Sequence, residues 1–102
     1  MNEHVLSQFR VGGGTYYDGR PHTLANLDCT LTDMRLVLRD FRGGTQQFLL
    51  ADITSIEPHM GLFNKYLDVK LGPAATMRFY GNRDELYGLA DKINMAMTSR
   101  FA

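Results

Sequence analysis

Residues 82–99 read NRDELYGLADKINMAMTS, and this stretch decides how the rest of the chain must be organised. Its apolar residues recur every three or four positions, which is the period of one face of an α-helix. Asn82 is a favoured N-cap, and Glu85 can return a hydrogen bond to the backbone of the cap. The pattern predicts an amphipathic helix from Arg83 to Ser99. Its apolar stripe, which must be buried, consists of Leu86, Leu89, Ala90, Ile93 and Met97.

Upstream of the helix, apolar residues alternate with polar ones, as they do in half-buried β-strands. Turn-forming residues, mainly glycine, proline and aspartate, separate the alternating runs. The pattern predicts seven short antiparallel strands, and these are the only elements that can cover the apolar face of the helix. The expected strands are residues 4–11, 24–31, 35–39, 45–50, 53–57, 66–71 and 76–80.

Some details of this strand pattern depend on single residues. Three consecutive glycines, Gly12–Gly14, favour a turn that ends the first strand, and residues 15–23 are expected to form a loop with partial hairpin character. Pro58 is expected to end or kink the fifth strand, and apolar residues out of step before it suggest a bulge or bend. In the helix, Gly88 is either a point of close approach or a tolerated glycine.

The composition fits one folded domain spanning residues 1–102. Eleven Lys and Arg balance eleven Asp and Glu, so no overall positive field draws the chain to nucleic acid. No apolar run is long enough to cross a membrane, and we expect a cytoplasmic protein, or one on the cytosolic face of a membrane. Cys29 is the only cysteine and lies in an alternating apolar run, where we expect a buried, inert thiol.

The residue types needed for catalysis are not grouped in the sequence. His4, His22 and His59 are far apart and form no pair at helical or strand spacing, which argues against a metal site. The run Gly12–Thr15 is followed by a turn or strand and not by the helix that a phosphate-binding loop needs. We therefore expect no enzyme, no cofactor and no small-molecule substrate.

The order of seven strands and one helix resembles that of pleckstrin-homology-like domains. The sequences of short segments are similar to those of the bacterial and GRAM-type branches. Three segments carry this resemblance: LDCTLTDMRL at residues 27–36, FLLADITSIE at 48–57 and GLF at 61–63. The resemblance implies a mainly β fold, with seven antiparallel strands in two partly orthogonal sheets closed by a C-terminal helix. It also implies a non-catalytic binding module, because the fold hosts lipid-binding, peptide-binding and assembling members.

Our leading interpretation of the function is protein–protein interaction or self-assembly through exposed sheet edges. The alternative is peripheral binding to anionic lipid head groups, since the resemblance places anion sites near the first–second and third–fourth strand loops. The residues that those loops offer are Arg10, Arg20, His22, Arg39 and Arg42. Asp18 and Asp40 dilute this positive charge, and the family's dense Lys/Arg pattern on the first two strands is missing.

A second candidate surface is the loop that contains Met60, Leu62 and Phe63. If these apolar side chains are exposed, they can enter a membrane interface or fill a pocket of a partner protein. If Leu62 or Phe63 folds back, the loop instead covers one end of the barrel.

Overall fold

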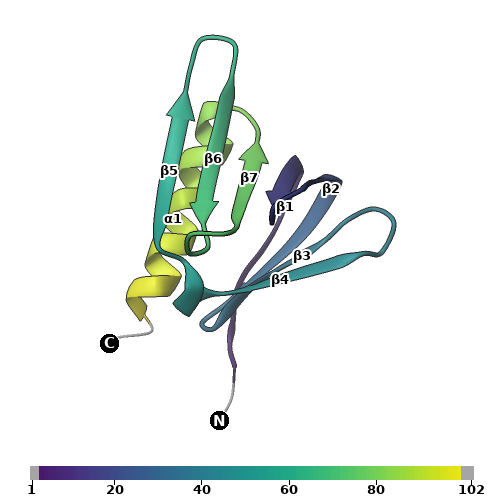
Figure 1. Ribbon diagram of the computed structural model, residues 1–102. Coiled ribbons are helices and arrows are strands. Elements are labelled where there is room, and N and C mark those ends of the chain that lie inside the picture. Colours follow the sequence, from purple (N-terminus) through teal and green to yellow (C-terminus); the bar gives the residue numbers. More distant parts are fainter. Residues whose placement is uncertain (1–2, 100–102) are drawn as a thin grey trace.

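The computed structural model describes residues 3–99, which form seven strands, one short 3₁₀ turn and one helix (Figure 1). The seven strands all belong to one antiparallel sheet in the order β4-β3-β2-β1-β7-β6-β5. The elements are β1 (Val5–Tyr17), β2 (Pro21–Thr32), β3 (Arg35–Arg39), β4 (Thr45–Leu49), η1 (Leu50–Asp52), β5 (Ser55–Met60), β6 (Lys65–Lys70), β7 (Thr76–Tyr80) and α1 (Arg83–Ser99).

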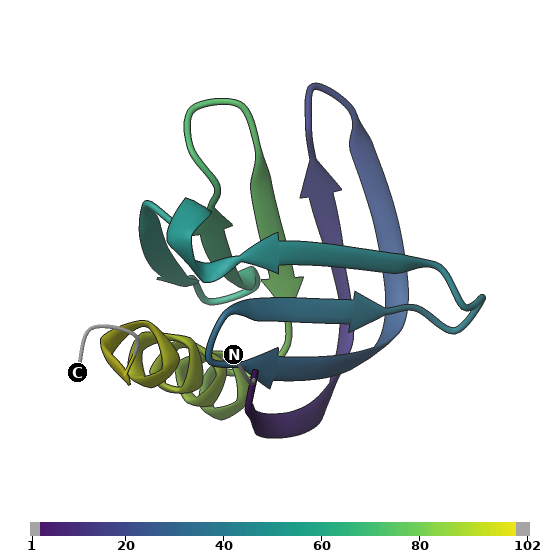
Figure 2. The same ribbon diagram turned by 90° about the horizontal axis from the view of Figure 1, so that it is seen from below.

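The sheet is folded so that its two halves face each other. Figure 2 shows β3 and β4 running across the direction of β1 and β7, so the two partly orthogonal layers expected from the sequence are halves of one continuous sheet. The seam between the halves is the pairing of β1 with β7, in which Gly13 faces Tyr80 and Tyr17 faces Thr76. Strands β4 and β5 are left as the two edges of the sheet.

The first strand is longer than the sequence suggested. The prediction that Gly12–Gly14 ends it was wrong, because β1 continues through these glycines to Tyr17 and residues 15–23 are strand ends around a tight turn. Gly13 and Gly14 allow close packing of the neighbouring strands instead. A Cβ on Gly14 would lie 2.5 Å from the backbone oxygen of Arg78, on β7. The turn itself is at Asp18–Arg20, where Gly19 adopts a φ of 98°, a value that glycine reaches at little cost.

The hydrophobic core lies between the two halves of the sheet and the helix. Its largest fully buried side chains come from β2, β3, β6, β7 and α1: Leu27, Leu31, Leu36, Leu38, Leu67, Val69, Met77, Phe79, Leu86 and Ile93, with Leu50 from η1. Cys29 is buried with them, as expected. Burial raises the pKa of its thiol to about 12, so this thiol stays protonated and inert at neutral pH.

The helix α1 matches its sequence prediction at both ends. The Asn82 side chain accepts a hydrogen bond from Glu85 N (2.9 Å), and the Glu85 side chain accepts one from Asn82 N (3.4 Å). The predicted stripe is buried, except that Met97 is only partly covered. Gly88 is not a point of close approach, because a Cβ there would meet no atom within 4 Å. Figure 1 shows the helix lying behind β5 and β6.

The fifth strand also departs from the prediction. Residues 50–52 form the 3₁₀ turn η1, which is the bend expected there, and β5 then runs from Ser55 to Met60. Pro58 neither ends nor visibly interrupts this strand, since it pairs with Leu67 of β6. It is tolerated because β5 is an edge strand, where only one side of the backbone needs ladder hydrogen bonds.

Candidate binding surfaces

The edge of β4 offers unpaired backbone groups. Asp40 N donates to Gly44 O and Leu50 N donates to Met34 O, both at 2.9 Å, so these two residue pairs bracket the β3–β4 ladder. Because hydrogen-bonded and non-hydrogen-bonded pairs alternate in an antiparallel ladder, the even-numbered residues of β4 bond to β3. The N–H and C=O groups of the odd-numbered residues then point to the open edge. These residues are Thr45, Gln47 and Leu49, all exposed and uncharged.

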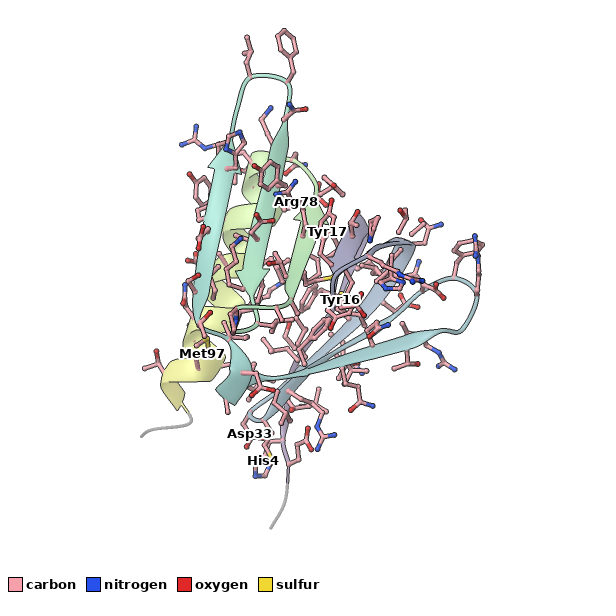
Figure 3. All side chains as sticks on the ribbon, viewed as in Figure 1. His4, Tyr16, Tyr17, Asp33, Arg78 and Met97 are labelled. Carbon is pink, nitrogen blue, oxygen red and sulfur yellow. The ribbon has the colours of Figure 1, made fainter. Side chains whose placement is uncertain are left out.

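A groove of about 310 Å³ lies beside this edge. It separates β4 and η1 from the β6–β7 turn, and Tyr16 forms part of its wall, with its ring 5.4 Å from that of Phe48. Figure 3 places Tyr16 between the two halves of the molecule. The residues around the groove are Tyr16, Gln47, Phe48, Leu49, Asp52, Leu71, Gly72 and Ala75, and Asp52 is the only charged one.

The edge of β5 is different. Gly61 N donates to Asn64 O (2.9 Å), and this pair continues the β5–β6 register. By the same alternation, the odd-numbered residues of β5 bond to β6 and the even-numbered ones face outward. Pro58 is therefore at an outward position in the middle of the edge, where it supplies no N–H and its ring obstructs an incoming strand.

The turn between β5 and β6 carries the two most exposed of the large apolar side chains in the described residues. Leu62 is 83% and Phe63 is 90% exposed, while Met60 is partly buried and packs against the core. Figure 1 shows that this turn projects beyond the other elements at its end of the molecule. The sequence left open whether Leu62 and Phe63 are exposed or fold back over the barrel. In the structure both are exposed.

A row of stacked side chains crosses the outer face of the sheet near this turn. The His59 and Tyr66 rings stack at 4.6 Å, and the Arg78 guanidinium lies 3.8 Å from the centre of the Tyr66 ring and 5.8 Å from that of Tyr17. Arg78 also donates two hydrogen bonds, of 2.8 and 3.0 Å, to the carboxylate of Asp68. Figure 3 shows Arg78 and Tyr17 on adjacent strands. These contacts raise the pKa of Arg78, chiefly through the hydrogen bonds with Asp68.

Sequence reasoning missed this row. Alternation does place Tyr66 and Asp68 on one face of β6, but their meeting with Arg78 depends on the β6–β7 register. Asp68 is buried although it is charged, and the bidentate pair with Arg78 satisfies it.

The five basic residues proposed for anion binding do not converge on one site. Arg10 pairs with Asp28 (2.8 Å) and His22 with Asp18 (2.8 Å), a contact that lowers the pKa of Asp18. Arg20 is in the β1–β2 turn with His22 close by, whereas Arg39 and Arg42 belong to the β3–β4 hairpin. Figure 2 shows these two hairpin turns pointing in different directions.

The Arg42 guanidinium covers the Phe41 ring at 5.2 Å. Its backbone N–H donates to Asp40 Oδ1, which also accepts from Gly44 N. A carboxylate thus lies within this basic turn, as it does in the β1–β2 turn, so neither loop is a dense positive patch.

The groups associated with catalysis are also dispersed. Within residues 3–99, no cluster of three or more His, Cys, Asp and Glu side chains has the geometry of a metal site. His4 N–H donates to Asp33, His22 contacts Asp18 and His59 stacks on Tyr66, so the three histidines lie at different places. Among the described helices, none has the length and apolarity needed to span a membrane.

Comparison with solved structures agrees with this architecture. The chain is similar to the Vps36 N-terminal PH domain, with a TM-score of 0.75 over 96% of this chain and 81% of that one, at 11% sequence identity. The fold is pleckstrin-homology-like. No protein-family model matches the sequence, and no curated protein matches it either. This likeness establishes the fold and not a function. Membership of a GRAM-type or bacterial branch stays a prediction.

Proposed function

We propose that this pleckstrin-homology-like domain is a protein-interaction module that takes an extended segment of a partner as an additional strand along β4. The observation that carries the proposal is the set of backbone N–H and C=O groups at Thr45, Gln47 and Leu49 that face away from β3. Backbone hydrogen bonds of this kind supply affinity in strand addition, and side-chain pockets supply specificity.

The groove beside β4 defines the chemistry of the partner segment. Alternate side chains of an added strand point to opposite faces, so one set would enter the space bounded by Tyr16, Phe48 and Leu71. That space favours aliphatic side chains. Asp52 at its margin favours a lysine or arginine next to them. The preferred segment is therefore extended, alternating and apolar, with one basic residue.

A display library of random octapeptides tests this proposal whatever the natural partner is. We expect selected peptides to match the pattern above and to slow amide hydrogen exchange at Thr45, Gln47 and Leu49. Gln47→Pro removes one outward N–H and places a ring in the edge, as Pro58 does in β5, so we expect affinity to fall at least tenfold, which corresponds to about 1.4 kcal/mol.

A second pair of variants separates edge blocking from misfolding. Leu49→Lys places a charge on the edge, whereas Met34→Lys makes the same change at a similarly exposed apolar residue in the β2–β3 turn (48% and 41% exposed). We expect only Leu49→Lys to weaken peptide binding. Selected peptides that bind both variants equally, or that protect amides elsewhere, would contradict the proposal.

A further inference from the structure

The turn at residues 61–64 has an unusual composition for its geometry. It is a tight four-residue turn closed by the Gly61–Asn64 hydrogen bond of 2.9 Å, and a Cβ on Gly61 would lie 2.9 Å from Asn64 O. The two central positions of such turns usually carry glycine, proline, asparagine or aspartate. Here they carry Leu62 and Phe63, both more than four-fifths exposed. Turn formation does not explain these residues, and neither does core packing.

The residues that flank the turn in sequence and those that line the groove beside it are positively charged or neutral. Lys65 follows immediately, with its Nζ 3.5 Å from Leu62 O, and no acidic residue occurs between Glu57 and Asp68. Asp68 itself is buried and neutralised by Arg78. A shallow groove of about 480 Å³ beside the turn has no acidic residue among its lining side chains, which are His59, Phe63, Asn64, Lys65, Tyr66, Arg78 and Tyr80.

We propose that Leu62 and Phe63 anchor the domain at the interface of a lipid bilayer, with Lys65 meeting the phosphate layer. Apolar side chains at the tip suit the boundary between head groups and acyl chains. Tyrosines set back from the tip, Tyr66 and Tyr80, have the amphipathic character found at the level of the head groups. This site is at the hairpin tip beyond the blocked edge of β5 and is independent of strand addition at β4.

A bilayer explains the turn better than a pocket on a partner protein. Protein interfaces need a broad complementary area around their apolar centre, on the order of 1,000 Å² in total. Here the apolar surface is confined to a projecting tip, and the hairpin below it cannot add a strand at its centre because Pro58 obstructs the edge. A bilayer accepts a convex tip without a matching surface.

The chain contains no tryptophan, so one introduced tryptophan is a unique reporter of its own surroundings. Phe63→Trp places it in the proposed anchor, and Phe41→Trp places it at another exposed turn, where Phe41 is 62% exposed. With vesicles of phosphatidylcholine and phosphatidylserine, we expect the fluorescence of Phe63→Trp to shift to shorter wavelength and that of Phe41→Trp to stay unchanged.

Co-sedimentation with the same vesicles measures the contribution of each group. We expect the double substitution Leu62→Asn and Phe63→Asn to lower partitioning at least tenfold, and Phe41→Asn to leave it unchanged. Lys65→Gln should lower partitioning about fivefold on vesicles with phosphatidylserine and little on phosphatidylcholine alone. Because an anchor has no enclosed head-group pocket, soluble glycerophosphoserine should not compete.

Three results would overturn the proposal. The first is absence of binding to both kinds of vesicle, and the second is binding that the double substitution leaves intact. The third is a spectral shift of Phe63→Trp that appears on adding a protein fraction and not on adding vesicles, which would assign the tip to a protein partner. All three leave the test of the β4 edge unaffected, because that test uses peptides and different residues.

Discussion

The two edges of the sheet differ in one respect that matters for binding. β4 presents outward backbone groups from Thr45, Gln47 and Leu49 with no charge and no proline, whereas β5 has Pro58 at the centre of its outward side. An unprotected edge invites pairing with another chain, and proline is one of the means by which proteins prevent it. Proline therefore obstructs strand addition along β5, whereas the outward side of β4 carries no such obstruction.

The largest expected effect is on stability, and it comes from a substitution in the seam where β1 pairs with β7. Gly14→Val would drive side-chain atoms into the backbone of Arg78, since even a Cβ would be 2.5 Å from its oxygen. We expect the free energy of unfolding to fall by about 3 kcal/mol, measured by urea denaturation. Gly12→Ala is the control, because a Cβ there meets nothing within 4 Å. Equal losses in both variants would show that the seam is not tightly packed.

A smaller effect is expected from the buried ion pair in the β5 half. The carboxylate of Asp68 accepts both hydrogen bonds from Arg78, and Asp68→Asn replaces it with a neutral amide. We expect the free energy of unfolding to fall by about 2 kcal/mol. The matched change Asp28→Asn breaks the exposed pair with Arg10 near the β4 half, for which we expect less than about 0.5 kcal/mol. Similar values for the two variants would contradict the role assigned to burial.

Replacing Pro58 makes the two edges alike. Pro58→Thr supplies the outward N–H, and we expect the unfolding free energy to fall by at most about 1 kcal/mol because the unfolded chain gains freedom. The more informative result is association: light scattering should show that the variant self-associates more than the parent at equal concentration. A variant that does not would indicate that Pro58 is not what protects β5.

A small effect of the opposite sign is expected in the helix that lies behind β5. Gly88→Ala introduces a methyl group into open space and removes a helix-weakening glycine, so we expect thermal unfolding to show a gain of about 0.5 to 1 kcal/mol. No gain, or a loss, would mean that the position is constrained in a way its surroundings do not indicate.

The raised pKa of Cys29, on β2, predicts how the stability of the protein depends on pH. Its thiol has a raised pKa in the folded protein, about 12 against an ordinary value of 9.0. Its contribution to stability is therefore fully present below pH 9 and is lost as the pH rises toward 12, because the unfolded chain releases this proton first. Cys29→Ala should flatten that part of the stability curve, and equal slopes in the two proteins would contradict this assignment.

Local patterns were enough to predict the helix and most of the strands. The Asn82–Glu85 cap and the three-to-four spacing behind it involve neighbouring residues, and so does the alternation around Leu27 and Leu31. The glycine run was misinterpreted as a turn because the close packing that requires Gly14 is against Arg78 of β7, which is far away in the chain. The role of Pro58 was missed for the same reason, since which strand becomes an edge depends on the pairing of the whole sheet.

The candidate binding surfaces were predicted less completely. Leu62 and Phe63 could be named from the sequence, but only the shape of the hairpin decides their exposure. The basic residues were grouped by analogy with strand loops. Asp18 could be named from the sequence as a residue that dilutes their charge, whereas the pairing of Arg10 with Asp28 becomes apparent only in the register of β1 and β2. The outward groups of β4 are backbone atoms, which no residue pattern identifies.

The pairing of β1 with β7 also has a consequence for folding kinetics. Tyr17 and Thr76 are partners in this seam although they lie on the order of 60 residues apart in the chain, while the other strand pairs join neighbours. Contacts between distant residues form late, because a long loop must close before they contribute. We therefore expect β1–β4 and β5–β7 to assemble as separate meanders, and the barrier to folding to be the step that joins them.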